Sequence, residues 1–181
     1  MSFLEKRKKK QKNSPSWNKV ADWYAGIVGK EGHYYHKNLI FPKLLEILKE
    51  SPPQSVLDLA CGQGVLLHQL SKKVDYYGID SSVSLIKEAK NMDREHKGSF
   101  SVADVTQSLP LEKKDFDVLT IILALQDIED VHKVFANANK HLKVGGRLII
   151  VINHPCFRIP RQTHWGVDEE SKIQYRRLNA Y

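Results

Sequence analysis

Three aspartates, Asp58, Asp80 and Asp104, are spaced along the sequence so that they could form one ligand-binding site. They lie in or directly after the apolar segments 55–60, 76–79 and 100–103. If these segments are parallel strands, their carboxyl ends share the edge of the sheet where open α/β folds bind ligands. A lone Asp after a strand more often caps a helix or a turn. Three such acids at successive strand ends favour a shared site.

A glycine turn follows the first of these segments. Gly62 and Gly64 stand where a turn from a strand to a helix lets a ligand approach the backbone. A dinucleotide site needs a third glycine, and Leu67 occupies that position. A carboxylate such as Asp58 repels a pyrophosphate and attracts a cation. The pattern favours a cofactor with an ammonium group and no phosphate, and S-adenosylmethionine fits this description.

Residues 58–64 (DLACGQG) resemble motif I of the class I, seven-stranded, Rossmann-like S-adenosylmethionine-dependent methyltransferases, small-molecule type. The resemblance extends over residues 55–152 and, more loosely, upstream to Trp17. It implies that Asp80 binds the ribose hydroxyls, that Asp104 binds the adenine amino group and that the backbone N–H of Val105 assists. The full set of cofactor contacts expected from the resemblance and the site pattern is Tyr24, His36, Asp58, Ala60, Gly62, Gly64, Asp80, Ser81, Asp104, Val105 and Leu123.

The elements that must position these residues alternate along the chain. Apolar runs and helical periodicity predict strands at 55–60, 76–79, 100–103, 116–122 and 147–152, and helices at 36–50, 65–73, 82–90 and 130–142. This alternation predicts an α/β three-layer sandwich with a mostly parallel, doubly wound sheet. After Ile152 only residues 172–178 read as a strand, so the sheet is expected to lack one or two of the family's C-terminal edge strands.

Four segments are expected along the chain. Residues 1–13 are predicted to be a disordered basic tail, residues 14–53 an N-terminal helical lid and residues 54–154 the Rossmann-like cofactor domain. Residues 155–181 are expected to be a C-terminal segment rich in loops. The chain could be truncated there. Within the lid, Tyr24 and His36 are the residues expected to touch the cofactor.

The acceptor side is expected where strands 116–122 and 147–152 end. Asp127 could accept a substrate proton, or it could open the next helix, where the macrodipole favours acids. His154 could act as a general base near neutral pH or make an ordinary polar contact. Gln126 and Asn153 are expected to face the substrate.

Composition sets further bounds. The formal net charge is +7, but six of the Lys and Arg residues lie within residues 1–13, so the rest of the chain is nearly balanced. The two cysteines are too few for a secreted disulfide framework, and no apolar stretch reaches the roughly 20 residues that span a bilayer. No signal peptide, metal-ligand spacing or membrane contact is predicted. The expected compartment is the cytoplasm, and the oligomeric state is not predicted.

The resulting hypothesis is an enzyme that transfers a methyl group from S-adenosylmethionine to an O, N or C nucleophile of a small molecule. One alternative is a tRNA or rRNA methyltransferase whose basic tail grips phosphates. Another is a cofactor-binding domain or fragment without catalytic activity. The acceptor, and whether its nucleophile needs a general base, are left open.

Overall fold

The computed structural model describes residues 26–29, 32–93, 97–154 and 163–178. A parallel sheet of five strands forms its centre, in the order β3-β2-β1-β4-β5. The strands are β1 (Ser55–Leu59), β2 (Asp75–Asp80), β3 (Ser99–Val102), β4 (Phe116–Ile122) and β5 (Leu142–Val151). The chain reverses its direction of winding between β1 and β4, so the predicted doubly wound α/β fold is confirmed.

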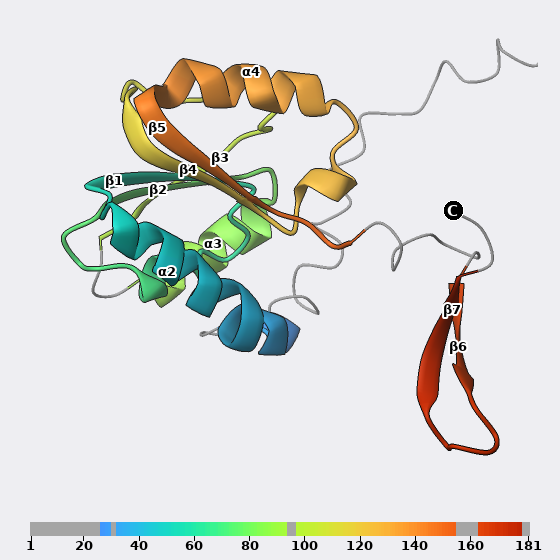
Figure 1. Ribbon diagram of the computed structural model, residues 1–181. Helices are drawn as coiled ribbons and strands as arrows, with labels where there is room; N and C mark the ends of the chain where they lie inside the picture. Colours follow the sequence, from blue (N-terminus) through green and yellow to red (C-terminus); the bar gives the residue numbers. More distant parts are fainter. Residues whose placement is uncertain (1–25, 30–31, 94–96, 155–162, 179–181) are drawn as a thin grey trace, which may run out of the picture.

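Helices cover both faces of this sheet. In Figure 1, α4 (Val131–His141) lies on one face, and α2 (Phe41–Glu50) and α3 (Val83–Met92) lie on the other. The sequence marks the helix starts: Pro42 stands in the first turn of α2, and the side chains of Ser82 and Asp130 cap α3 and α4. The π-helical turn η2 (His36–Ile40) leads directly into α2. The predicted helix 36–50 therefore forms as two joined pieces.

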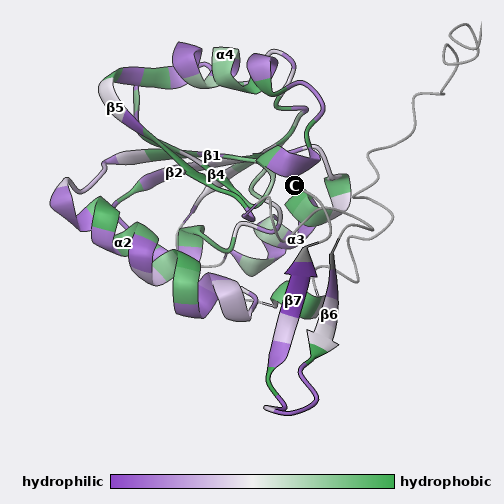
Figure 2. Cartoon of the chain, turned by 45° about the vertical axis from the view of Figure 1, so that its right-hand side comes forward, coloured by the Kyte–Doolittle hydropathy of each residue, from purple (hydrophilic) through white to green (hydrophobic). Residues whose placement is uncertain are grey.

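Two apolar clusters form the core, one on each face of the sheet. Val56 and Val118 belong to the cluster beneath α2, whereas Leu57 and Leu119 belong to the cluster beneath α4. Neighbouring strand residues thus point to opposite faces, and both faces are buried. Figure 2 shows the central strands as hydrophobic and the helices as mixed. This burial holds the carboxyl ends of the strands in fixed positions.

One local prediction is wrong. Residues 65–73 do not form an α-helix, because three buried leucines and bonds of the 3-10 type leave only the short turn η3 (Leu67–Gln69). Gly145 and Gly146 lie inside β5, where the positive φ of Gly145 accompanies a shift in the pairing with β4.

A separate antiparallel hairpin follows the sheet. It consists of β6 (Thr163–Val167) and β7 (Gln174–Leu178), and it stands clear of the five-stranded sheet in Figure 1. Only its second strand is predictable from the sequence, because Gly166 interrupts the first. In the described part of the chain, no helix is both long and apolar enough to cross a membrane. The predicted tail 1–13 lies outside the described residues.

Candidate active site

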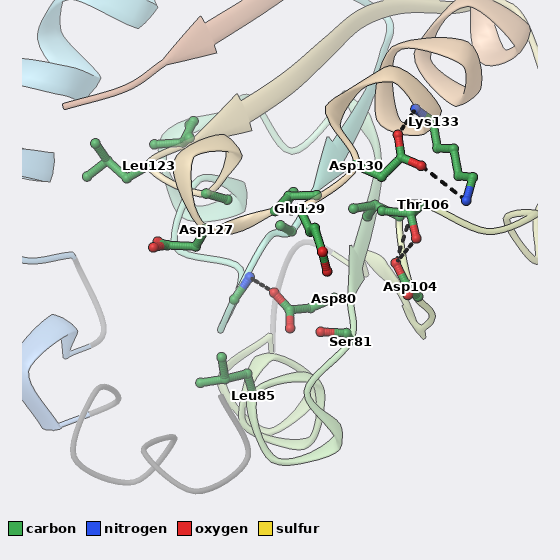
Figure 3. Close-up of a pocket in the computed structure, with 16 residues that line it drawn as sticks. Asp80, Ser81, Leu85, Asp104, Thr106, Leu123, Asp127, Glu129, Asp130 and Lys133 are labelled. Carbon is green, nitrogen blue, oxygen red and sulfur yellow. Dashed lines mark hydrogen bonds and ion pairs between the residues drawn. The ribbon is translucent and has the colours of Figure 1, made fainter. Parts of the chain in front are cut away.

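A pocket of about 910 Å³ opens at the carboxyl ends of β1, β2 and β4 (Figure 3). The structure brings eight of the predicted site residues together in its lining: Ala60, Gly62, Asp80, Ser81, Asp104, Val105, Leu123 and Asp127. They come from segments that are distant in sequence, and the parallel strands bring them to one edge. The pocket is large enough for a nucleoside-sized ligand.

Asp80 fastens the end of β2 to the glycine turn. Its Oδ2 accepts a hydrogen bond from the backbone N–H of Gly62 at 2.9 Å, and its Oδ1 accepts one from the N–H of Ser82 at 2.8 Å. Burial raises the pKa of this carboxyl group, and the backbone hydrogen bonds oppose the shift. The carboxyl group therefore lines the pocket in a fixed position, beside the turn that a ligand would approach.

Asp104 shapes the loop after β3. Its Oδ1 accepts hydrogen bonds from both the backbone N–H and the hydroxyl of Thr106, at 2.8 and 2.7 Å. The side chain of Asn137 in α4 donates to the carbonyl of Val105 at 2.7 Å. This loop is thus held from within and from α4, which gives the exposed Asp104 a defined place on the rim of the pocket.

Two pocket residues have a left-handed backbone without being glycine. Ala60 follows β1 with a φ of 58°, and Leu123 follows β4 with a φ of 52°. Such conformations cost on the order of 1–3 kcal/mol each and concentrate at functional sites. The N–H of Leu123 also donates to the carbonyl of Val151 at 2.7 Å, which joins this turn to the end of β5. Both strained turns lie at the boundary between β1 and β4.

Asp58 does not line the larger pocket but lines a small cavity next to it. Tyr76 donates its hydroxyl to Oδ2 and Thr120 donates to Oδ1, each at 2.7 Å. Burial raises the pKa of Asp58 to about 6, although both hydrogen bonds act to lower it. The carboxyl group supports the end of β1 from inside the fold. Its direct contact with a cofactor stays a prediction.

A small cavity of about 30 Å³ adjoins the pocket and shares Ala60, Gly62 and Ile122 with it. Two buried polar atoms in its lining, Nδ1 of His36 and Oε1 of Gln63, have no hydrogen-bond partner among the residues that the structure describes. Burial, followed by the nearby His33, lowers the pKa of His36, so the imidazole is neutral near pH 7. Unsatisfied buried groups are unfavourable unless a ligand or a water supplies the partner.

The predicted acceptor-side residues are only partly brought together. Asp127 ends the short turn η4 (Leu125–Asp127) and lines the pocket. Gln126 folds back and donates to the carbonyl of Leu123 at 2.6 Å, outside the lining. Asn153 and His154 are exposed beyond the end of β5. The substrate-facing and catalytic roles of these residues stay predictions.

One described residue predicted to contact the cofactor, Gly64, lines neither the larger pocket nor the small cavity. Gly64 is buried against Phe100, whose ring would lie 2.7 Å from a Cβ at this position. Its requirement for glycine is therefore explained by packing and by a φ of 73°. Tyr24 lies outside the described residues. Contact of Gly64 or Tyr24 with a cofactor stays a prediction.

Other lining residues were missed by the sequence analysis. Thr106, Glu129 and Lys133 line the larger pocket, and Gln63 lines the small cavity. Figure 3 shows Glu129 pointing into the pocket toward Asp80, while Lys133 pairs with Asp130 at 3.1 Å. The position of Gln63 between the two glycines was a usable signal. Within the described residues, no group of three or more His, Cys, Asp or Glu side chains could hold a metal ion.

Comparison with known proteins gives the same class as the fold and the pocket. A family model described as a methyltransferase domain matches residues 50–171, and the chain belongs to this family. An S-adenosylmethionine-dependent methyltransferase from Clostridium acetobutylicum is similar in structure, with a TM-score of 0.61 and 28% identity. The match covers 86% of this chain and 66% of that one. The predicted family is therefore confirmed.

Curated relatives match in sequence as well. A demethylmenaquinone methyltransferase of Thermotoga maritima is 31% identical over 112 residues, which cover 60% of this chain and 48% of the relative. A malonyl-[acyl-carrier protein] O-methyltransferase of Hahella chejuensis is 27% identical over 164 residues, which cover 88% of this chain and 56% of the relative. The chain thus spans about half the length of these relatives.

Proposed function

We propose that this chain binds S-adenosylmethionine in the larger pocket and transfers its methyl group to an O, N or C atom of a small molecule. One observation carries the proposal: Asp80 and Asp104 line the same pocket beside the glycine turn. Buried and rim carboxylates suit the hydroxyls, the amino groups and the positive charge of this cofactor. The names of the relatives, which are methyltransferases, support the proposal.

The lining has a place for each part of the cofactor. Asp80 would accept the ribose hydroxyls, because a carboxylate oxygen that already accepts one N–H has a further lone pair. Asp104 and the N–H of Val105 would bind the adenine edge. The unsatisfied atoms of His36 and Gln63 would receive the amino end, directly or through one water, which the small cavity can hold.

The chain's own contribution is positioning. S-adenosylmethionine supplies an electrophilic methyl group on a sulfonium when it is bound. The turn at Leu123 and the apolar Ala124 and Ile128 would enclose the space in front of that methyl group and exclude water. Holding an acceptor in line at contact distance accounts for much of the rate enhancement in such reactions. Asp127 is the group in the lining best placed to take a proton from the acceptor.

Calorimetry with S-adenosylhomocysteine tests the binding site. Asp80→Asn is expected to weaken binding by about tenfold or more, because a charge-assisted pair of hydrogen bonds to the ribose is lost. Asp75→Asn is the matched control, since Asp75 begins the same strand β2 and lies at the opposite edge. Equal affinities of the two variants would contradict the assignment. An acceptor screen with labelled donor then tests transfer, and binding without turnover would favour a non-catalytic domain.

A small-molecule acceptor is the proposed partner. The alternative of an RNA substrate depends on residues 1–13, which lie outside the described residues, so no observed contact favours it. Removal of these residues is expected to leave activity unchanged. A cytoplasmic location, suggested by the low cysteine content, is part of the same proposal.

A further inference from the structure

Gln63 joins the glycine turn to the N-terminal segment 26–29. It lies between the two glycines of the turn, and only 2% of its surface is exposed. Its Nε2 donates a hydrogen bond to the backbone carbonyl of Gly29 at 2.5 Å and also contacts the sulfur of Met92 in α3 at 4.0 Å. Val28, next to Gly29, is buried in the core cluster beneath α2. A hydrogen bond and the burial of Val28 therefore hold the segment in place.

The contact with Gly29 sets the orientation of the Gln63 amide. A backbone carbonyl can only accept a hydrogen bond, so the nitrogen and not the oxygen of the amide faces Gly29. Because the amide group is planar, a bond through Nε2 also sets the direction of Oε1. This oxygen has no hydrogen-bond partner among the described residues, and Gln63 lines the small cavity. Gly29 thus holds an unsatisfied acceptor beside the cavity.

The polar side chains around the small cavity are suited to a ligand that donates hydrogen bonds. Besides Gln63, the lining contains the carboxyl group of Asp58 and the imidazole of His36, whose Nδ1 has no partner in the described part of the chain. A neutral imidazole accepts through Nδ1 in one of its tautomers. An ammonium group, which has three N–H donors and a positive charge, satisfies these acceptors better than a carboxylate or a phosphate does.

Gly29 has a backbone conformation that other residues adopt only with strain. Its φ is 59°, and a Cβ at this position would have open space among the described residues. An alanine here would therefore act through the backbone alone. Gly26 is exposed and helical in the same segment, and it also has open space around its Cβ position but no positive φ. The two glycines form a matched pair for a test of the Gly29 backbone.

We propose that Gly29 is a positioning residue for the cofactor: its carbonyl orients the amide of Gln63, and Oε1 then accepts a hydrogen bond from the amino end of the cofactor. This inference rests on the proposed function, because it requires the cofactor in the adjoining larger pocket. A side chain that is already held in its bound orientation loses less conformational entropy when the ligand binds. The segment 26–29 thereby contributes to cofactor affinity without touching the cofactor.

Two nucleosides isolate this contribution from the rest of the site. S-adenosylhomocysteine carries the amino-acid end, whereas 5′-methylthioadenosine has the same adenine, ribose and thioether without it. Calorimetry on the 181-residue chain gives the dissociation constant of each ligand. The ratio of the two constants, here called the amino-end preference, depends on the contacts of the amino-acid end. A substitution that only loosens the fold weakens both ligands alike and leaves this preference unchanged.

The variants come in matched pairs. Gly29→Ala is expected to lower the amino-end preference by about threefold or more, because alanine strains the left-handed backbone and displaces the carbonyl. Gly26→Ala is the control and is expected to leave the preference unchanged. Gln63→Met keeps the length of the side chain without its amide, and it is expected to lower the preference by about tenfold. Its control is Met92→Leu, which removes the sulfur contact and leaves the amide in place.

The double variant Gly29→Ala/Gln63→Met shows whether Gly29 acts through Gln63. If it does, the double variant has the same amino-end preference as Gln63→Met, because the two changes remove one shared interaction. Additive losses overturn the proposal, and so does an equal weakening of both ligands by Gly29→Ala. If Gln63→Met does not fold, Gln63→Asn replaces it with the same expected direction, because it shortens the reach of the amide.

The same titrations separate this inference from the proposed function. If neither nucleoside binds the native chain, the proposed function is contradicted and the inference is overturned with it. If both nucleosides bind but Gln63→Met leaves the amino-end preference unchanged, the inference alone is overturned and the cofactor site in the larger pocket stands.

Discussion

The hydroxyl of Tyr76 lies 2.7 Å from Oδ2 of Asp58, within the sheet and beneath the glycine turn. The bond joins β2 to β1, and Thr120 in β4 completes the contact from the other side. The acid of motif I is therefore a link between three adjacent strands. A substitution at Asp58 is expected to affect stability as well as cofactor binding.

The stability of the protein is expected to depend on the ionisation of Asp58. Its pKa in the folded chain, about 6, is above the ordinary value of 3.8, so the folded state binds the proton more tightly than the unfolded state. This stabilisation is complete below pH 3.8 and is lost as the pH rises through about 6. The loss is on the order of 3 kcal/mol. Urea titrations of the native chain and of Asp58→Asn over this pH range measure the loss. If the free energies of unfolding of the two proteins change with pH in parallel, the assignment is contradicted.

For Asp117, the expected dependence of stability on pH has the opposite sign. Its Oδ2 accepts hydrogen bonds from the N–H groups of Gln54 and Ser55, each at 2.8 Å. Lys143, which contacts Oδ1, is the main reason that its pKa is lowered to about 2. The stabilisation is present above pH 3.8 and is lost as the pH falls toward 2. Asp117→Asn is expected to cost about 1–3 kcal/mol at neutral pH.

The measurement for Asp117 is denaturant unfolding as a function of pH. The difference between the native chain and Asp117→Asn is expected to shrink at acid pH. Lys143→Met is the control. Without the lysine, the pKa of Asp117 is expected to be less strongly lowered, so the loss of stability in acid should begin at a higher pH. A constant difference at all pH values is the contrary outcome.

The strained turn at Ala60 predicts a stabilising substitution. Ala60→Gly is expected to raise the free energy of unfolding by about 0.5–1 kcal/mol, because glycine adopts a positive φ without strain. Ala136→Gly is the matched control in the exposed middle of α4, where glycine is expected to cost about 1 kcal/mol. Thermal or urea unfolding shows whether Ala60→Gly stabilises the chain and Ala136→Gly destabilises it. Destabilisation by both would show that the backbone at Ala60 is unstrained.

A substitution at His36 is expected to have opposite effects on stability and on ligand binding. His36→Phe removes a buried nitrogen that has no partner in the described part of the chain, and it is expected to stabilise the ligand-free chain by about 1 kcal/mol. The same change is expected to weaken binding of S-adenosylhomocysteine by about tenfold. The control is Tyr35→Phe on the adjacent, exposed residue. Unfolding and calorimetry measure the two effects, and unchanged affinity would remove His36 from the site.

The pH dependence at His36 has a defined direction. Its pKa is lowered by burial and then by His33, so the folded chain binds the proton less tightly than the unfolded chain. Its contribution to stability is lost as the pH falls below the ordinary value of 6.5. His36→Phe is expected to abolish this part of the acid sensitivity.

The strands and the shared edge of the site were predictable, because β1 and β4 are continuous apolar runs and the acids follow strand ends. The burial of Asp58 was not predictable. Its partners Tyr76 and Thr120 lie 18 and 62 residues away in sequence, and only the pairing of the strands brings them to it. Motif spacing gives the position of an acid along a strand and not the groups around it.

The wrongly predicted helix at residues 65–73 and the unpredicted pocket residue Glu129 have different causes. The apolar run after Gly64 has the composition of a helix, but burial of its leucines on several sides favours a compact turn. Glu129 precedes α4 and reads as an ordinary acid at a helix start. Its inward direction depends on the course of the chain after Leu123. Tertiary packing decided both outcomes.

The strand order separates the two partners of the proposed reaction. Asp80 ends β2 and Asp104 follows β3 on one half of the sheet, whereas Asp127 follows β4 on the other half. The halves meet at the reversal between β1 and β4. Evolution can therefore alter the second half to accept new chemistries while the first half keeps the same methyl donor.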